Sequence, residues 1–220
     1  MKMIDLSMTI KDHWRWKVRQ TLHHDFEKGD ETRSSIFEMG AHGFTHVDTP
    51  LHCKPGSITL EKLSVDAYSG SAAVVDISFK QPNESITVDD LQKNGAHIQH
   101  GDIIILKTCW DKHFDPNSKE YWTEAPYVSE EAAQWLKEQN PRAVGFDFPQ
   151  DYALKLIDRG GNWKLDELTT HKYLLNNDIL HIEYLCNMSE VTSERIELIA
   201  LPLKLEGFEG GPARVVALER

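Results

Sequence analysis

The run from His42 to His52, HGFTHVDTPLH, places three histidines and an aspartate within eleven positions. His46 and Asp48 are two residues apart, so both side chains leave the same face of an extended segment. His42 precedes His46 by four residues, an even offset that keeps it on that face if the segment stays extended. The glycine, the β-branched residues and Pro50 within the run disfavour a helix. We therefore predict an extended segment that gathers these side chains on one face.

Imidazole nitrogens and a carboxylate that converge on one point suit Zn²⁺, Mn²⁺ or Fe²⁺, which accept both nitrogen and oxygen ligands. Pro50 ends regular strand pairing and allows His52 to approach from a turn. The alternative is a polar loop whose histidines each make a separate hydrogen bond. Four metal-capable residues in one short run, with strand parity, favour a metal site over that alternative.

Short apolar runs alternate with helix-like segments in the rest of the chain. Thr87 and Ser129 are N-cap residues for helices that we expect over Val88–Asn94 and from Glu130 onward. Strands and helices interleave, and no linker divides the chain, so we predict one α/β domain over residues 1–220. The other expected elements are strands at 72–77, 103–108, 143–146, 179–185, 196–203 and 213–218, and a helix from 169 or 170 through 175.

Composition excludes several classes of function. The 220 residues carry a net charge of −11, which argues against nucleic acid or an anionic membrane as the main partner. No stretch approaches the roughly 20 apolar residues of a membrane span, and the first residues lack the apolar core of a signal peptide. We expect a cytoplasmic protein. Its three cysteines, Cys53, Cys109 and Cys186, form no disulfide or zinc-ribbon pattern, although Cys53 follows His52 and could reach a site as a soft ligand.

The histidine run is similar to the His-x-Gly-Thr-His-x-Asp-x-Pro-x-His signature of the cyclase family, which includes bacterial kynurenine formamidase (arylformamidase) and isatin hydrolase. The resemblance covers nearly the whole chain. It includes the opening Asp5-Leu6-Ser7, the segment Gly101 to Trp110, the stretch Val144 to Asp147, and the closing segments 201–204 and 211–214. The resemblance implies a cyclase-type fold of the swivelling β/β/α type.

The resemblance also implies roles for individual residues. His42, His46 and Asp48 match the ligands of a first metal ion, and Asp48 would bridge to a second. His171 and Glu183 are twelve residues apart, like the family's ligands of the second ion. His52 matches the proton-transfer histidine. The implied cofactor is Zn²⁺ or Mn²⁺, two ions per subunit. His181 shares the strand parity of Glu183; an exposed position is expected for it, with a role beside the metal ligands as the alternative.

Two positions depart from the family pattern. The family usually has glycine where Phe44 stands, and here the glycine comes one place earlier, at Gly43. Cys109 replaces the glycine of the family's Thr-Gly-Trp segment. A glycine often marks a backbone conformation that other residues adopt with difficulty. Phe44 could therefore alter the loop or fill part of a substrate pocket, whose apolar wall we also assign to Trp14 and Trp16, with core or dimer packing as the alternative for the two tryptophans.

The function implied by the resemblance is that of a metal-dependent amidohydrolase, in which metal-bound hydroxide hydrolyses an aryl formamide such as N-formylkynurenine and His52 transfers the proton. Two alternatives remain open: hydrolysis of a cyclic amide or lactone, as in isatin hydrolase, and a non-catalytic metal-binding protein or cyclase partner. The expected partners are a small-molecule amide or lactone and further copies of the chain, as a homodimer or homotetramer.

Overall fold

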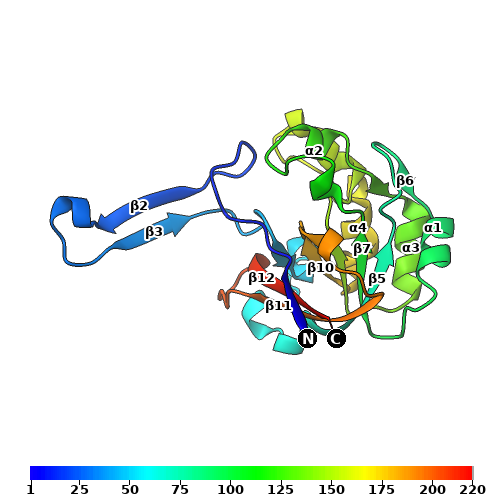
Figure 1. The fold of residues 1–220 in the computed structure, drawn as a ribbon. Helices are drawn as coiled ribbons and strands as arrows, with labels where there is room; N and C mark the ends of the chain where they lie inside the picture. Colours follow the sequence, from blue (N-terminus) through cyan, green and yellow to red (C-terminus); the bar gives the residue numbers. More distant parts are fainter. Residues whose placement is uncertain (220) are drawn as a thin grey trace.

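Strands from both ends of the chain join one mixed sheet in the computed structural model, which describes residues 1–219 (Figure 1). The strand order is β1-β12-β11-β5-β7-β9-β10-β4, and β12 also pairs with β4, so that the strands from β12 round to β4 form a closed ring. The strands β5, β7, β9 and β10 run parallel to one another, and the remaining pairs are antiparallel. The bounds are β1 (Lys2–Asp5), β4 (His46–Asp48), β5 (Ser69–Asp76), β7 (Ile103–Lys107), β9 (Ala143–Phe146), β10 (Leu180–Glu183), β11 (Arg195–Pro202) and β12 (Gly210–Glu219).

Alternate residues of the parallel strands β5, β7 and β9 enter two different hydrophobic cores. In β7, Ile103 and Ile105 pack inside the ring, whereas Ile104 and Leu106 pack outside it. This follows from the two-residue period of a strand. Because both faces are covered, the strand reads as a continuous apolar run.

The helices cover the outer core on one side of the sheet (Figure 1). Thr87 and Asp90 form a capping box at the start of α1, and the Ser129 hydroxyl accepts a hydrogen bond from the Ala132 backbone N–H at the start of α3, as the sequence predicts. The helices are α1 (Val88–Asn94), α2 (Glu120–Thr123), α3 (Glu130–Glu138) and α4 (Thr169–Tyr173), and a small parallel pair joins β6 (Ser85–Ile86) to β8 (Tyr127–Val128). The expected mixed α/β class and the single domain are confirmed. Among residues 1–219, no helix has the length and apolar character needed to cross a bilayer.

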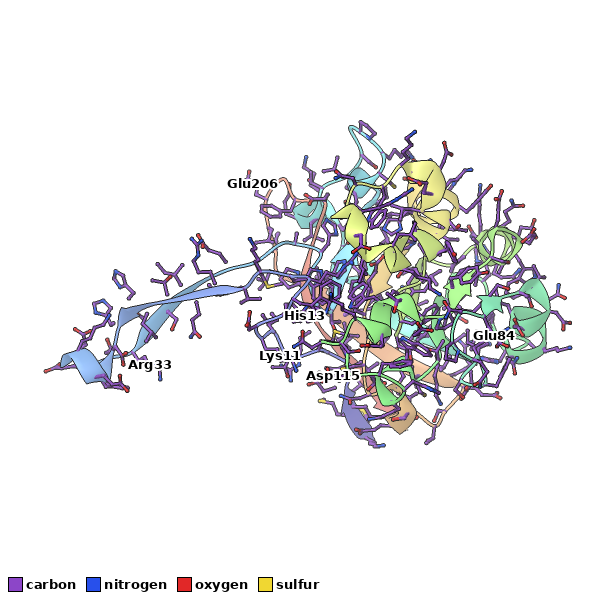
Figure 2. The ribbon with its side chains drawn as sticks, turned by 90° about the horizontal axis from the view of Figure 1, so that it is seen from above. Lys11, His13, Arg33, Glu84, Asp115 and Glu206 are labelled. Carbon is purple, nitrogen blue, oxygen red and sulfur yellow. The ribbon has the colours of Figure 1, made fainter. Side chains whose placement is uncertain are left out.

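A two-stranded hairpin projects far from the body of the molecule (Figure 1). It comprises β2 (Arg19–His24) and β3 (Ser34–Glu38), which pair only with each other, and we call residues 19–38 the arm. Arg33 lies near the far end of the arm, whereas His13 lies in the body (Figure 2). Every residue of β3 is exposed, including Ile36 and Phe37. The strand signals of the arm are weak, and the sequence did not predict it.

Candidate active site

Two adjacent strands place four metal-capable side chains in facing pairs. In the antiparallel pairing of β10 with β4, His181 lies opposite Asp48 and Glu183 lies opposite His46. Val47 and the residue opposite it, Ile182, belong to the core inside the ring. The two-residue period therefore directs the four polar side chains to the outer face together. All four are buried, and His181, expected to be exposed, has 0% exposure.

His42 reaches this group from a turn. The extended conformation predicted from position 42 is wrong, because residues 41–45 form turns and bends and only residues 46–48 are a strand. Phe44 in this turn has φ 59°, in the left-handed region, and its residue type gave no warning of the bend. His42 nevertheless approaches Asp48, with 2.7 Å between His42 Nδ1 and Asp48 Oδ1. The even spacing therefore predicted correctly that His42 lies beside Asp48, although the backbone conformation from which we predicted it was wrong.

The remaining two predicted histidines enter from separate elements. His52 ends a 3₁₀ turn at Pro50–His52 that Thr49 caps, and its ring centroid lies 3.9 Å from that of His42. His171 lies on α4, where its Nδ1 is 2.7 Å from Asp151 Oδ2 and its Nε2 is 3.6 Å from Glu183 Oε1. The structure therefore brings together all six side chains singled out as ligands or as the proton carrier.

A cavity of about 220 Å³ opens over this group. Among the three residues that we assigned to a substrate wall, Trp16 lines it. The prediction for Phe44 is wrong: Phe44 does not line this cavity but is buried, with 4.9 Å between its ring centroid and that of Trp16. The prediction for Trp14 is also wrong: Trp14 does not line this cavity but packs edge-on against Trp122. Residues 14 and 16 do not belong to a strand. The other lining residues are Arg15, Leu154, Gly161, Trp163, Leu168 and Tyr184, besides the histidines and acids.

The buried carboxylates of this site are neutralised by histidines. Among residues 1–219, the ion-pair partners of Asp48, Asp151 and Glu183 are all histidines. Burial opposes the charged ring, but Asp48 and Glu209 outweigh it and raise the pKa of His42 to about 9.

The pKa values of His171 and His52 are shifted by the same surroundings. Burial also opposes the charged form of His171, but Asp151 and Glu183 raise its pKa to about 9. Burial lowers the pKa of His52 to about 4, although one side of this residue faces solvent. At neutral pH, His42 and His171 hold protons that compensate buried negative charge, a task that a cation can take over.

The donor atoms of this site fit a divalent cation. The Nδ1 atom of His46 lies 2.8 Å from the carbonyl oxygen of Phe44, so Nδ1 carries the hydrogen and Nε2 presents its lone pair. His46 Nε2 and Asp48 Oδ2 are buried and have no hydrogen-bond partner. Unpartnered buried polar atoms are costly. An ion bound between them would satisfy both.

Three neighbours of the site were not found from the sequence. Asp151 orients His171 in the way that carboxylates orient metal-binding histidines. Glu209 Oε1 lies 3.0 Å from His42 Nε2. A Cβ atom on Gly210 would come within 2.9 Å of both Asp48 Oδ1 and His42 Cε1. The glycine pair after Glu209 carries no signal of this close approach, because the contact depends on the pairing of β12 with β4.

Comparison with known proteins places the chain in a family. The cyclase family model matches residues 4–150. A kynurenine formamidase from Bacillus thuringiensis (strain Al Hakam) is 31% identical over 218 residues, covering 97% of this chain and 95% of the relative. The chain belongs to the cyclase family. As a member, it is a metal-dependent hydrolase.

Solved structures share the fold of this cyclase-family protein. One, described as a predicted metal-dependent hydrolase from Bacillus stearothermophilus, is 26% identical with a TM-score of 0.77 and covers 100% of this chain and 98% of its own. Isatin hydrolase A from Labrenzia aggregata, bound to benzyl benzoate, has a TM-score of 0.79 and covers 98% of this chain and 93% of its own. At 19% identity the second likeness shows the fold alone.

The two departures from the family's glycines share one backbone feature. Phe44 has φ 59° and Cys109 has φ 57°, so each non-glycine residue adopts the left-handed conformation that glycine adopts freely. The loop path expected to change at Phe44 thus keeps a glycine-like conformation. Cys53 donates weakly to two backbone carbonyls and belongs to no potential ligand group among residues 1–219.

Proposed function

We propose that this protein is an amidohydrolase that cleaves an aryl formamide, with N-formylkynurenine as the first candidate, and that residues 1–220 act as one catalytic domain. The observation that carries the proposal is a pair of buried potential metal-ligand atoms, His46 Nε2 and Asp48 Oδ2, which have no hydrogen-bond partner and lie at an aromatic cavity. Kynurenine formamidases are near full-length relatives of the chain.

The proposed ligands divide into two sets that share Asp48. His42, His46 and Asp48 each offer one ligand atom, and these atoms lie within 4.8 Å of one another. Asp48, His171 and Glu183 also belong to one such group. Nitrogen and oxygen donors suit Zn²⁺ or Mn²⁺, and a bound divalent ion lowers the pKa of water from ~15.7 to about 7. His171 would be held in orientation by Asp151.

His52 is the proposed proton carrier. It lies against His42 but is exposed on one side, so it can face both the ligand group and the substrate. With a pKa of about 4 the ring is neutral at pH 7, and a neutral imidazole can accept a proton from water and donate it to the leaving nitrogen. The ring centroid of His52 also lies 5.5 Å from that of His171, so His52 is close to residues of both ligand sets.

The cavity wall favours a substrate that has an aromatic ring and a carboxylate. Trp16, Trp163 and Tyr184 offer aromatic surface for an aryl ring. Arg15 also lines the cavity, stacks 4.1 Å from the ring centre of Trp122, and has no acidic partner among residues 1–219. A guanidinium without a carboxylate partner favours a substrate that brings its own carboxylate. N-formylkynurenine does so, whereas isatin and simple aryl lactones do not.

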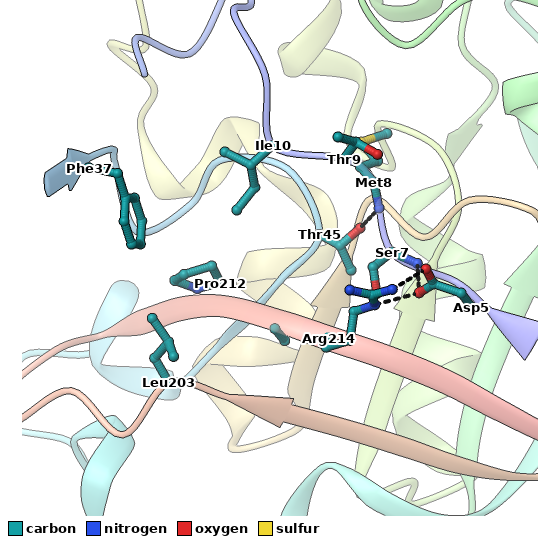
Figure 3. Close-up of a pocket in the computed structure, with 11 residues that line it drawn as sticks. Asp5, Ser7, Met8, Thr9, Ile10, Phe37, Thr45, Leu203, Pro212 and Arg214 are labelled. Carbon is teal, nitrogen blue, oxygen red and sulfur yellow. Dashed lines mark hydrogen bonds and ion pairs between the residues drawn. The ribbon is translucent and has the colours of Figure 1, made fainter. Parts of the chain in front are cut away.

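A homo-oligomer is part of the proposal. An isolated two-stranded hairpin is marginally stable in water, and the arm exposes Ile36 and Phe37 without any covering element. A hollow of about 420 Å³ lies where the arm joins the body, lined in part by Phe37, Ile10 and Leu203 (Figure 3). This hollow contains no histidine. Apolar surface of this kind suits a contact with a second copy.

The proposed function is tested by rates measured in parallel on N-formylkynurenine, isatin and several aryl lactones, together with elemental analysis of protein purified without added metal. We expect the highest kcat/KM on N-formylkynurenine and close to two ions per chain. A preference for isatin or a lactone would support the alternative hydrolase. Metal-bound protein inactive on every substrate would contradict the proposed aryl formamide substrate. Full activity in a metal-free sample would contradict the mechanism.

A further inference from the structure

His181 is a buried histidine that the two-ion arrangement leaves without a role. Its side chain has 0% exposure, and its Nε2 has no hydrogen-bond partner. Its Nδ1 lies 3.2 Å from Glu183 Oε1. A carboxylate oxygen only accepts, so in the neutral ring Nδ1 carries the hydrogen and Nε2 presents a free lone pair. A buried lone pair without a partner needs an explanation.

The sheet register places the His181 ring at the site. His181 lies directly opposite Asp48 in the pairing of β10 with β4. Asp48, His171, His181 and Glu183 each offer one ligand atom, and these four atoms lie within 4.8 Å of one another. We propose that His181 is a fourth protein ligand of the ion held by Asp48, His171 and Glu183, an inference that rests on the proposed function.

The surroundings of His181 support ligation over simple packing. Its ring meets the ring of His171 edge-on at 5.1 Å and that of Phe146 at 5.3 Å. An aliphatic side chain would fill such a space without leaving a polar atom unpaired. The Glu183 carboxylate already receives a hydrogen bond from Gln150, so orienting Glu183 does not by itself require His181.

Four protein ligands would make the two ion sites unequal. Sites closed by four protein ligands are typical of structural zinc, whereas catalytic sites keep a position open for water or substrate. The ion at Asp48, His171, His181 and Glu183 would be enclosed, and the ion at His42, His46 and Asp48 would keep the open positions. That second set lies nearer His52, the proposed proton carrier.

Metal titration of the full-length chain tests this assignment. Metal-free wild type, His181→Leu and the control His97→Leu are titrated with Zn²⁺ against a chromophoric chelator. His97 Nε2 already bonds the Val74 carbonyl outside the site, so its variant should bind both ions like wild type. Loss of an orienting residue typically weakens metal binding about 10–100-fold. We expect His181→Leu to keep one ion and to weaken the other by more than about 100-fold; a smaller change overturns the assignment.

A spectroscopic variant tests direct ligation without relying on affinity. In His181→Cys loaded with Co²⁺, a thiolate bound to the ion gives a sulfur-to-cobalt charge-transfer band in the near ultraviolet. Wild type contains Cys53, Cys109 and Cys186 and should show no such band. Absence of the band in His181→Cys overturns the proposal. Wild-type protein that binds no metal would instead contradict the proposed function, so the two failures are distinguishable.

Discussion

The outer face of β4 and β10 differs from the arm in how its side chains are fixed. At the site, most functional side chains are buried and held by neighbours from elements distant in sequence, as His171 is held by Asp151. In the arm, residues 19–38 pair only among themselves and expose apolar side chains. The side chains of the site are fixed by contacts within one chain, whereas the arm exposes apolar surface that we propose contacts a second copy. Changes at the site should therefore alter chemistry, and changes in the arm should alter assembly.

The largest effect is expected from His52→Ala. Loss of a positioned proton carrier typically costs about 10²–10⁴-fold in rate, and we expect that loss in kcat with metal content unchanged. The control is His23→Ala, which removes an exposed histidine of the arm and should leave kcat as in wild type. Steady-state kinetics and elemental analysis provide the measurements. A fully active His52→Ala enzyme would remove His52 from the mechanism.

Gly210→Ala tests how closely the site is packed. The added Cβ would meet Asp48 Oδ1 and His42 Cε1 at 2.9 Å and the Val47 carbonyl oxygen at 2.6 Å. We expect metal affinity to fall about 10–100-fold, as when a neighbour of a ligand is disturbed. In Gly40→Ala the new Cβ meets nothing within 4 Å, so chelator competition should give the wild-type affinity. Equal affinities for both variants would show that the site tolerates displacement.

Part of the site could be predicted from the sequence because strand parity is a local property. The two-residue period places His46 with Asp48, whereas His171 and Glu183 were singled out only by the resemblance to the cyclase family. Burial of His181 could not be read in the same way. Its environment depends on which strand pairs with β10 and in which register, and that information is distributed over the whole sheet.

The turn before β4 and the arm were missed for different reasons. Position 44 adopts φ 59° although phenylalanine rarely does so, so residue type predicted an extended segment. The arm lacks a clean alternation because neither of its faces is buried within the chain. A pattern that burial does not impose cannot be recognised from periodicity.

In the arm, Ile36→Asp should weaken self-association. Ile36 is 54% exposed, and a charge in its place would be desolvated in any apolar contact with a second copy. We expect the dissociation constant to rise about 30-fold, equivalent to roughly 2 kcal/mol, by analytical ultracentrifugation. Ser35→Asp adds the same charge without removing apolar surface and should have a smaller effect. A chain that is monomeric as wild type would contradict the proposed oligomer.

Arg15→Gln separates substrate recognition from catalysis. If Arg15 binds a substrate carboxylate, the variant should raise KM for N-formylkynurenine about tenfold, as expected for loss of a charged hydrogen bond. The KM for formanilide, which has no carboxylate, should stay within about twofold. The kcat on both substrates should change little, because the proposed contact is remote from the formamide. Equal increases of KM for both substrates would indicate that Arg15 acts only by packing on Trp122.

The smallest expected difference is that between two variants of the turn that joins the arm to the site. Phe44 is buried against His13 and Trp16, so its removal costs about 3–5 kcal/mol in free energy of unfolding. Alanine retains a Cβ at φ 59°, whereas glycine does not, and the left-handed conformation costs a residue with a Cβ about 1 kcal/mol. Phe44→Gly should therefore be about 1 kcal/mol more stable than Phe44→Ala in urea unfolding. The reverse order would mean that the turn relaxes out of the left-handed region once the ring is gone.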